Sequence, residues 1–255
     1  MTSLSVDPES ISKFQADGFV AFPKFLFGDE LAELIEKVDR FVKYTAPGLP
    51  PEAVFYDDKS DPGSLKQIQQ MGDHDPWFDQ QFRDSRFQEV AEALIGGTVV
   101  PKNMQYFNKP PGTSKPTPPH QDGYYFMLDP CSAVTMWLAL DDVDEQNGCV
   151  RYVRGSHHQP MRNHSRTETL GFSQGIADYP TDEDQAHEVA IPAAPGDLLV
   201  HHAMTIHRAD QNRSVDRSRR SLGFIYYDRR AEHDAMAHAE YQRQLEMQMK
   251  AAGKI

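Results

Sequence analysis

An imidazole and a carboxylate lie two positions apart at His120 and Asp122, inside an aromatic-rich run over 118–126. Because side chains at positions i and i+2 of a β-strand point to the same face, an extended run presents both groups side by side. Tyr124 and Phe126 are expected to follow on that face. Together with a histidine from elsewhere, such a pair forms the two-histidine, one-carboxylate site that leaves one side of an iron octahedron open for cosubstrate and oxygen.

A second histidine must come from a later strand that folds back beside the first. Three candidates follow a Gly-Asp turn signal and a Leu-Leu-Val strand signal: His201, His202 and His207. Another pair, at 157–158, comes directly after Gly-Ser, which indicates a turn. Most histidines bind no metal, so residue type and spacing leave the choice among the candidates open.

The segment after these histidines contains a basic strand that places Arg219 and Ser221 on one face and Arg220 on the other. Arginine binds a carboxylate through two parallel hydrogen bonds and stays charged at any working pH. An Arg-x-Ser strand shortly after a metal-binding histidine is therefore suited to hold the far carboxylate of a dicarboxylic cosubstrate. For Arg217 and Arg220 we favour a simple surface role.

Composition excludes several classes of protein. The 255 residues include 26 Lys or Arg and 38 Asp or Glu, which gives a formal net charge of −12. A phosphate backbone repels such a chain, which argues against nucleic acid as a partner. Cys131 and Cys149 are too few for a disulfide framework or a structural zinc site and favour a reduced, cytoplasmic protein. No signal peptide and no membrane-spanning run is visible, and the oligomeric state stays open.

Helical patterns dominate the first third of the chain. Helices are expected over 8–17, 29–42 and 83–95, where caps or apolar residues at helical spacing occur, and a terminal helix over 232–254. Segment 47–63 is expected to be loop, 66–71 a strand or short helix, and 163–185 a polar insert that is a candidate lid. Strands are expected over 19–22, 99–100, 104–107, 120–128, 134–140, 149–153, 188–191, 198–201 and 219–227.

Many short strands at this spacing predict an all-β barrel or jelly roll with flanking helices. We expect one domain over 1–255. Its helical part is expected at about 1–97, its jelly-roll core at about 98–228 and its C-terminal helix at about 232–254.

Six segments in this order carry a resemblance to a known family: 107–112 (FNKPPG), 120–123 (HQDG), 134–142 (VTMWLALDD), 147–149 (NGC), 155–157 (GSH) and 207–222. Together they resemble the phytanoyl-CoA dioxygenase family of Fe(II)/2-oxoglutarate-dependent oxygenases. The resemblance implies a double-stranded β-helix, or cupin-like jelly roll, and the cofactors Fe(II), 2-oxoglutarate and O2. It also implies hydroxylation of an unactivated C–H bond of a small metabolite, with release of succinate and CO2.

Carried over position by position, the resemblance makes three residues the iron ligands: His120, Asp122 and His207. It matches His202 to a family histidine that lies five residues before the ligand and binds no metal. The resemblance, and not spacing alone, therefore selects among the later histidines.

Four further matches concern 2-oxoglutarate. Arg219 matches the arginine that pairs with its distal carboxylate, and Lys66 matches a lysine that helps to hold the same group. Met104 and Trp137 match residues that line the cosubstrate pocket. The resemblance thus implies a basic end to the site, opposite the metal.

The sequence departs from the family pattern near this basic end. Ala209 stands where the family often has serine, two residues after the distal histidine. The interval from His207 to Arg219 is also one residue longer than expected. Because Ser221 shares a strand face with Arg219, we expect Ser221 to supply the missing hydroxyl.

Side chains next to the ligands are candidates for contacting an organic substrate: Gln121, Tyr124 and Phe126. Tyr125 is expected to pack on the far face of its strand. Such residues suit many small ligands, so acyl-CoA and a small polar or amphipathic metabolite both stay open, and we favour the latter. Two other classes also stay open: a non-catalytic jelly-roll binding protein, and a cupin-type metal hydrolase or isomerase, in which Arg219 and Lys66 would have no task.

Overall fold

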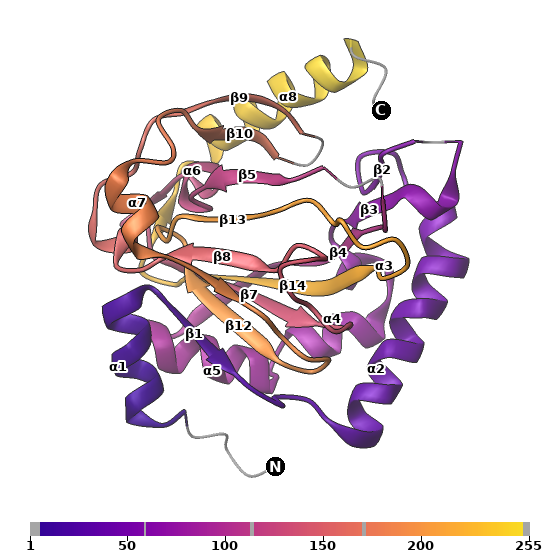
Figure 1. The fold of residues 1–255 in the computed structure, drawn as a ribbon, viewed down its shortest axis with the longest axis horizontal. Coiled ribbons are helices and arrows are strands. Elements are labelled where there is room, and N and C mark those ends of the chain that lie inside the picture. The colour runs from indigo at the N-terminus through magenta and orange to yellow at the C-terminus, as the bar shows by residue number, and fades with distance from the viewer. Residues whose placement is uncertain (1–5, 59, 113–114, 170–171, 252–255) are drawn as a thin grey trace.

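The computed structural model describes residues 6–58, 60–112, 115–169 and 172–251. Its framework is a seven-stranded and a four-stranded antiparallel sheet (Figure 1). In order across the larger sheet, the strands are β1 (Phe19–Phe22), β12 (Leu198–His202), β7 (Ala133–Ala139), β14 (Arg219–Asp228), β4 (Val99–Lys109), β3 (Leu65–Ile68) and β2 (Val54–Tyr56). In the smaller sheet they are β11 (Glu188–Ile191), β8 (Val150–Val153), β13 (His207–Ala209) and β5 (Thr117–His120).

The inner faces of the two sheets pack on each other. Phe19 and Trp137 of the larger sheet belong to the same buried cluster as Val150 and Tyr152 of the smaller one. The rings of Phe19 and Tyr152 stack with centroids 4.5 Å apart. Neighbouring strands come from distant parts of the chain, as in the pairing of β1 with β12. The predicted jelly roll, a double-stranded β-helix with flanking helices, is confirmed.

Helices from the first part of the chain cover the outer face of the larger sheet: α1 (Pro8–Asp17), α2 (Gly28–Arg40), α3 (Met71–His74), α4 (Pro76–Phe82) and α5 (Arg86–Ile95). The later helices, α6 (Gly123–Phe126), α7 (Asp182–His187) and α8 (Ala235–Ala251), lie outside this layer. The predicted start of α1 is confirmed, since the Asp7 side chain accepts from the Ser10 N–H. A π-helical turn, Phe41–Thr45, extends α2, and short 3-10 turns occupy Ala46–Gly48, Pro62–Ser64 and Ser156–His158.

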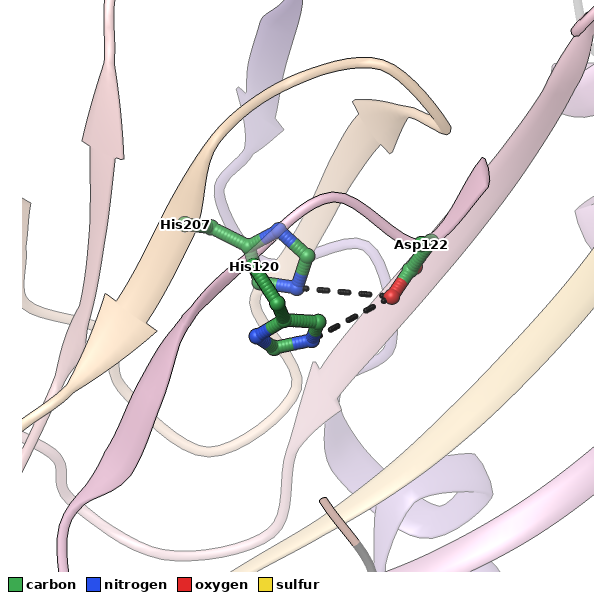
Figure 2. A group of neighbouring side chains, drawn as sticks. All are labelled: His120, Asp122 and His207. Carbon is green, nitrogen blue, oxygen red and sulfur yellow. Dashed lines mark ion pairs between the residues drawn. The ribbon is translucent and has the colours of Figure 1, made fainter. Parts of the chain in front are cut away.

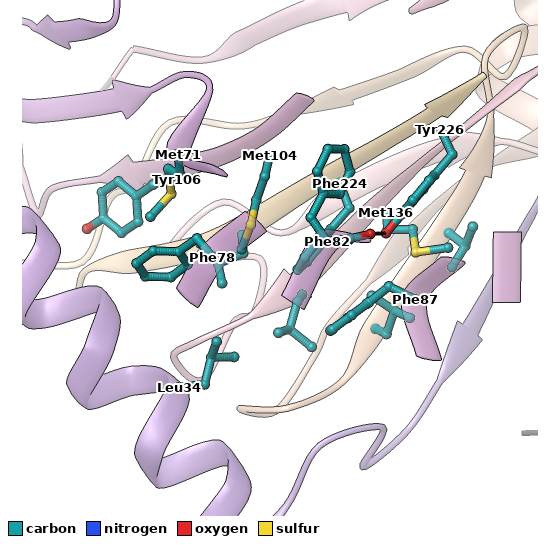
Figure 3. Packing of buried hydrophobic residues seen from close by; sticks show 14 of the residues in the cluster. Leu34, Met71, Phe78, Phe82, Phe87, Met104, Tyr106, Met136, Phe224 and Tyr226 are labelled. Carbon is teal, nitrogen blue, oxygen red and sulfur yellow. Dashed lines mark hydrogen bonds between the residues drawn. The ribbon is translucent and has the colours of Figure 1, made fainter. Parts of the chain in front are cut away.

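The main core lies between these helices and the sheet (Figure 3). Met104, Met136 and Phe224 come from the central strands, and the ring of Phe87 on α5 stacks on Phe224 with centroids 4.1 Å apart. Strand alternation sends the intervening side chains to the other face of the sheet. The helical layer therefore closes one face and leaves the inner face available for a site.

Three expectations about the chain between these elements were wrong. Segment 47–63 contains β2, which extends the edge of the larger sheet, and the two strands expected in 99–107 are one strand, β4. Segment 163–185 contains the hairpin of β9 (His164–Thr169) and β10 (Phe172–Ile176). β2 is short and β9 is polar, so their pairing comes from tertiary contacts that periodicity does not report.

The C-terminal segment returns to the open end of the jelly roll. After the short pair of β6 (Leu128–Asp129) with β15 (Glu232–His233), α8 lies at the same end of the molecule as β5, β9 and β10 (Figure 1). The helix expected over 232–254 is present as α8, after β15, and 252–254 lie outside the described residues. In the described part of the chain, no helix is long and apolar enough to cross a bilayer.

Candidate metal centre

His120 and Asp122 lie close together, but not because they share a strand face. β5 ends at His120, and Asp122 has helical dihedral angles (φ −58°, ψ −33°) that lead into the single turn of α6. The Gly123 N–H donates to the Ala203 carbonyl at 2.8 Å and so fixes this turn. The predicted strand over 120–128 was wrong, because this long-range hydrogen bond takes the chain out of the sheet.

The three predicted ligands form one group (Figure 2). β13 pairs with β5 so that His207 lies opposite His120. The Nε2 atoms of His120 and His207 lie 3.4 and 3.7 Å from Oδ1 of Asp122, and the three candidate ligand atoms lie within 4.8 Å of one another. This spacing and donor set fit a single metal ion held on one face, as in non-haem iron sites.

Backbone carbonyls orient both imidazoles. Nδ1 of His120 lies 2.8 Å from the Pro118 oxygen, and Nδ1 of His207 lies 3.0 Å from the Thr205 oxygen. Because a carbonyl can only accept, each Nδ1 carries the ring proton of a neutral imidazole, and each Nε2 keeps its lone pair for a metal.

The second oxygen of Asp122 is held from behind. His201 Nε2 lies 3.1 Å from Oδ2, and the Thr135 hydroxyl donates to Oδ2 at 2.5 Å. Tyr152 Oη in turn lies 3.1 Å from Nδ1 of His201. These contacts turn Oδ1 toward the two ligand imidazoles. His202 lies apart from the group, with its Nδ1 accepting from a backbone N–H.

The charge states of the cluster suit metal binding. Burial opposes ionisation of Asp122, but its contacts with His207, His120 and His201 outweigh burial and hold its pKa well below the usual 3.8. Burial, with the neighbouring His120 and His201, lowers the pKa of His207 well below 6.5. At neutral pH the centre therefore offers a carboxylate and a neutral His207 imidazole, the forms that bind metal.

The metal centre faces a cavity of about 900 Å³ lined by residues of both sheets. Basic groups outnumber acidic ones among the described residues of its wall: Lys66, Lys102, Lys109, Arg208, Arg219 and Arg243, against Glu52 and Asp122. In a chain with a net charge of −12, this concentration of positive charge favours anionic ligands.

Arg219 is one of the two most deeply buried of these cations, with 5% of its surface exposed. Its guanidinium carbon lies 4.8 Å from the ring centroid of Trp137, and its Nε donates to the Gly148 carbonyl at 3.0 Å. Burial lowers the pKa of Arg219 to about 10, so it is still protonated at neutral pH. No carboxylate of the described residues forms an ion pair with it. A buried cation in this situation is suited to bind an anion.

Two lysines lie beside Arg219. Lys66 lines the cavity, as expected, with its Nζ 3.9 Å from Asp57 Oδ1. Lys109 is buried, and its Nζ donates to the Lys115 carbonyl at 2.8 Å. Burial, Arg219 and Lys66 lower the pKa of Lys109 well below 10.5. Lys109 was not predicted, although it pairs directly with Arg219 across β4 and β14. We call these three basic groups, with Trp137, the inner end of the cavity.

Two residues predicted to contact the cosubstrate, Met104 and Ser221, are not part of the cavity wall. The side chain of Met104 packs in the main core and does not line the cavity, so that prediction was wrong. On β4 the neighbours Asn103 and Gln105 line the cavity, and alternation turns Met104 toward the helices. Ser221 is fully buried, is not part of the cavity wall, and its hydroxyl has no hydrogen-bond partner among the described residues. Its contact with 2-oxoglutarate stays a prediction.

Of the candidate substrate residues, Phe126 lines the cavity. The amide of Gln121 is instead fully buried and bonded to two backbone groups. The ring of Tyr124 stacks on His164, with centroids 4.2 Å apart, and does not line the cavity. Tyr125, which was expected to pack away from the site, lines it. Tyr124 and Tyr125 thus lie opposite to expectation, because the helical turn of α6 replaces strand alternation with helical spacing.

Comparisons with known proteins give one consistent result. The model of the phytanoyl-CoA dioxygenase family matches residues 14–221. A phytanoyl-CoA dioxygenase of Arabidopsis thaliana is 26% identical over 244 residues, covering 82% of this chain and 85% of that protein. The peroxisomal phytanoyl-CoA dioxygenase of Bos taurus is 31% identical over 134 residues, covering 49% of this chain and 39% of that protein.

Solved structures share the architecture. The epimerase SnoN, crystallised with Fe3+, alpha ketoglutarate and nogalamycin RO, superposes with a TM-score of 0.71 at 25% identity, covering 88% of this chain and 84% of that one.

Proposed function

The chain belongs to the phytanoyl-CoA dioxygenase family of Fe(II)- and 2-oxoglutarate-dependent oxygenases, and from that premise we propose that it hydroxylates an unactivated C–H bond of a small metabolite. The reaction consumes O2 and 2-oxoglutarate and releases succinate and CO2. The observation that carries this proposal is one cavity with a His-Asp-His group on its wall and a buried arginine at its inner end.

We assign the metal to His120, Asp122 and His207. When bound there, Fe(II) supplies the redox chemistry that couples oxidative decarboxylation of 2-oxoglutarate to oxidation of the substrate. These three side chains would hold the metal from the wall of the cavity and would leave room there for exchangeable ligands. His201 and Thr135 act as positioning residues, because they fix the rotation of the Asp122 carboxylate.

We assign the distal carboxylate of 2-oxoglutarate to the inner end. The planar fork of Arg219 matches a carboxylate, and its packing on the Trp137 ring limits the rotamers that the guanidinium can adopt. Lys66 adds positive charge, and the buried Lys109 adds N–H donors, in an environment where an ion pair is stronger than in bulk water. A dicarboxylic keto acid can therefore be oriented with one end at Arg219 and the other toward the metal.

The test is product analysis with the full chain, Fe(II), 2-oxoglutarate and O2 across a library of small metabolites. We expect at least one compound to stimulate succinate formation and to gain one oxygen atom, which 18O2 labels. Succinate formed with a product of unchanged mass would indicate isomerisation instead. Turnover that requires metal but no 2-oxoglutarate would indicate a cupin-type hydrolase or isomerase, and binding without turnover a binding protein.

We also propose that the described elements form one domain, with the helical part at about 1–97 supporting the jelly-roll core at about 98–228. The shared main core, which joins residues of both parts, supports this proposal. A reduced compartment such as the cytoplasm is supported by Cys131 and Cys149, both free thiols. Limited proteolysis that releases a separately folded N-terminal fragment would contradict the single domain.

A further inference from the structure

A second group of basic side chains lies at the other end of the cavity. Lys102 of β4, His233 of β15 and His238 of α8 all line the wall. The Nζ of Lys102 lies 5.1 Å from the ring centroid of Tyr227, and the His233 and Tyr227 centroids are 6.1 Å apart. The rings of His233 and His238 have centroids 5.0 Å apart. β4 is thus brought beside the distant C-terminal segment of β15 and α8, so that three basic groups meet, and we call this group the outer end.

The outer end contains no compensating acid in the described residues. None of its three side chains forms an ion pair with a carboxylate there, whereas Arg243, which also lines the cavity, is paired with Glu240. Two acids flank His233 in the chain: Asp234 uses its side chain to accept the Ala237 N–H, and Glu232 is exposed to solvent. Burial, His233 and Lys102 all lower the pKa of His238, which is the direction expected for basic groups that crowd one another.

Aromatic rings lie between the metal centre and the outer end. The ring centroids of His120 and Tyr125 are 6.0 Å apart, and those of Tyr125 and Tyr241 of α8 are 6.2 Å apart. A second ring pair is formed by Phe126 and Tyr227, whose centroids are 5.0 Å apart. All four aromatic residues line the cavity. A ligand that extends outward from the metal therefore passes apolar ring faces before it reaches the basic groups.

We propose that Lys102, His233 and His238 bind an oxyanion of the organic substrate, a carboxylate or a phosphate monoester, while Tyr125, Phe126, Tyr227 and Tyr241 hold its apolar part. The substrate class is then a small organic anion with an apolar segment between its charged group and the C–H bond that is oxidised. This inference rests on the proposed function, because it takes the bound anion to be the compound that is oxidised. Binding of the anion itself can be measured without turnover.

The position of these residues relative to the family match supports this assignment. The match covers residues 14–221 and contains the metal ligands and Arg219. Tyr227, His233, His238 and Tyr241 come after it. The inner end thus lies in the part that the family model describes, and much of the outer end is built by sequence outside that part. A wall that recognises a particular substrate is expected to have this distribution, since relatives share the cosubstrate and differ in substrate.

Inorganic phosphate is a direct probe. The full-length protein, loaded with redox-inert Zn(II) and saturated with 2-oxoglutarate so that the inner end is occupied, is titrated over pH with phosphate or with chloride at equal ionic strength. Histidine Cε1–H signals are followed by NMR and assigned with His233→Asn and His238→Asn. Because an anion favours the imidazolium form, we expect phosphate to move the His238 midpoint upward by about 0.5 pH unit or more.

Matched variants decide whether the named groups are responsible. Lys102→Gln should remove at least half of the phosphate-induced movement, and Lys13→Gln, an exposed lysine of α1, should leave it unchanged. Methyl phosphate and acetate then distinguish the two oxyanions by the larger response. A midpoint that does not move, a movement unchanged in Lys102→Gln, or a movement seen only without 2-oxoglutarate would each overturn the proposal. Absence of a hydroxylated product would instead count against the proposed function and leave this titration unaffected.

Discussion

The two basic ends of the cavity use different chemistry for the same kind of ligand. The inner end has buried side chains, with Arg219 and Lys109 each about 5% exposed, whereas Lys102 and His233 at the outer end are open to solvent. A guanidinium in a buried site binds strongly and stays charged. Imidazoles near solvent bind more weakly and respond to pH. The inner end thus suits a cosubstrate bound in every cycle, and the outer end a substrate that must be admitted and released.

Loss of a metal ligand is expected to have the largest effect, because turnover depends on the metal whatever binds at either end. We expect His207→Ala to reduce turnover by more than roughly a hundred-fold, because changes to partners behind a ligand alone typically cost about 10–100-fold. Iron binding, measured by metal analysis after desalting, should fall with it, while circular dichroism keeps the β-sheet signal.

The matched control is His202→Asn, which keeps an acceptor for the Met204 N–H and lies outside the ligand group. We expect it to retain iron. Full activity in His207→Ala together with loss of iron in His202→Asn would show that the wrong histidine was assigned.

The inner end is tested by Arg219→Lys. The charge stays, but the two-pronged contact with a carboxylate is lost, so we expect the apparent affinity for 2-oxoglutarate to fall by roughly thirty-fold, or about 2 kcal/mol. Isothermal titration with the Zn(II) protein measures this without turnover. Metal content should not change, because Arg219 is not part of the ligand group.

Arg220→Lys is the control at the next position of the same strand. Its side chain points the other way and pairs with Asp141 and Asp39. We expect a lower melting temperature and an unchanged affinity for 2-oxoglutarate. Equal affinity losses in the two variants would mean that Arg219 has no special role.

The pH dependence separates the ends most directly. Arg219, whose pKa is about 10, is charged throughout pH 5.5–8.5, so the affinity that Arg219→Lys removes should be nearly constant over that range. The pKa of His238 is lowered from 6.5, so the imidazolium that favours an anion forms only as pH falls. Sulfate keeps its double charge over this range, so we expect its affinity for the outer end to rise by roughly ten-fold from pH 8 to pH 5.5, or about 1.4 kcal/mol. A constant sulfate affinity would contradict the role of the histidines.

Local signals predicted much of the fold. Strands such as β1 and β11 begin and end where their apolar and β-branched runs do, and α1 begins at its Asp7 cap. The hairpin of β9 and β10 was missed because its strands are polar, and their pairing depends on neighbours in space. Sequence periodicity reports burial on one face of an element, and it does not report which element covers that face.

Sequence patterns also failed to report how the site residues are placed in space. His120 and Asp122 were identified from their types and spacing, yet the reason given, a shared strand face, fails because β5 ends at His120. Lys109 was missed although it lies in a motif used for the resemblance, since only the register of β4 against β14 places it beside Arg219. His233 and His238 were not predicted as site residues, because only the folded chain places them near Lys102 of β4 and Tyr227 of β14.

Ser221 carries the smallest expected effect and tests how far the inner end extends. Its hydroxyl is fully buried and has no hydrogen-bond partner among the described residues, which usually costs free energy unless a ligand or water meets the group. It lies two positions after Arg219 on β14, on the same face of the strand. If the hydroxyl donates to the distal carboxylate, Ser221→Ala should weaken 2-oxoglutarate about five-fold, or roughly 1 kcal/mol, measured by the same titration as for Arg219→Lys. Ala209 lines the cavity, so Ala209→Ser in the Ser221→Ala background should restore part of the affinity. An unchanged affinity in Ser221→Ala with a raised melting temperature would show that the hydroxyl is merely an unsatisfied buried group, and that the inner end stops at Arg219.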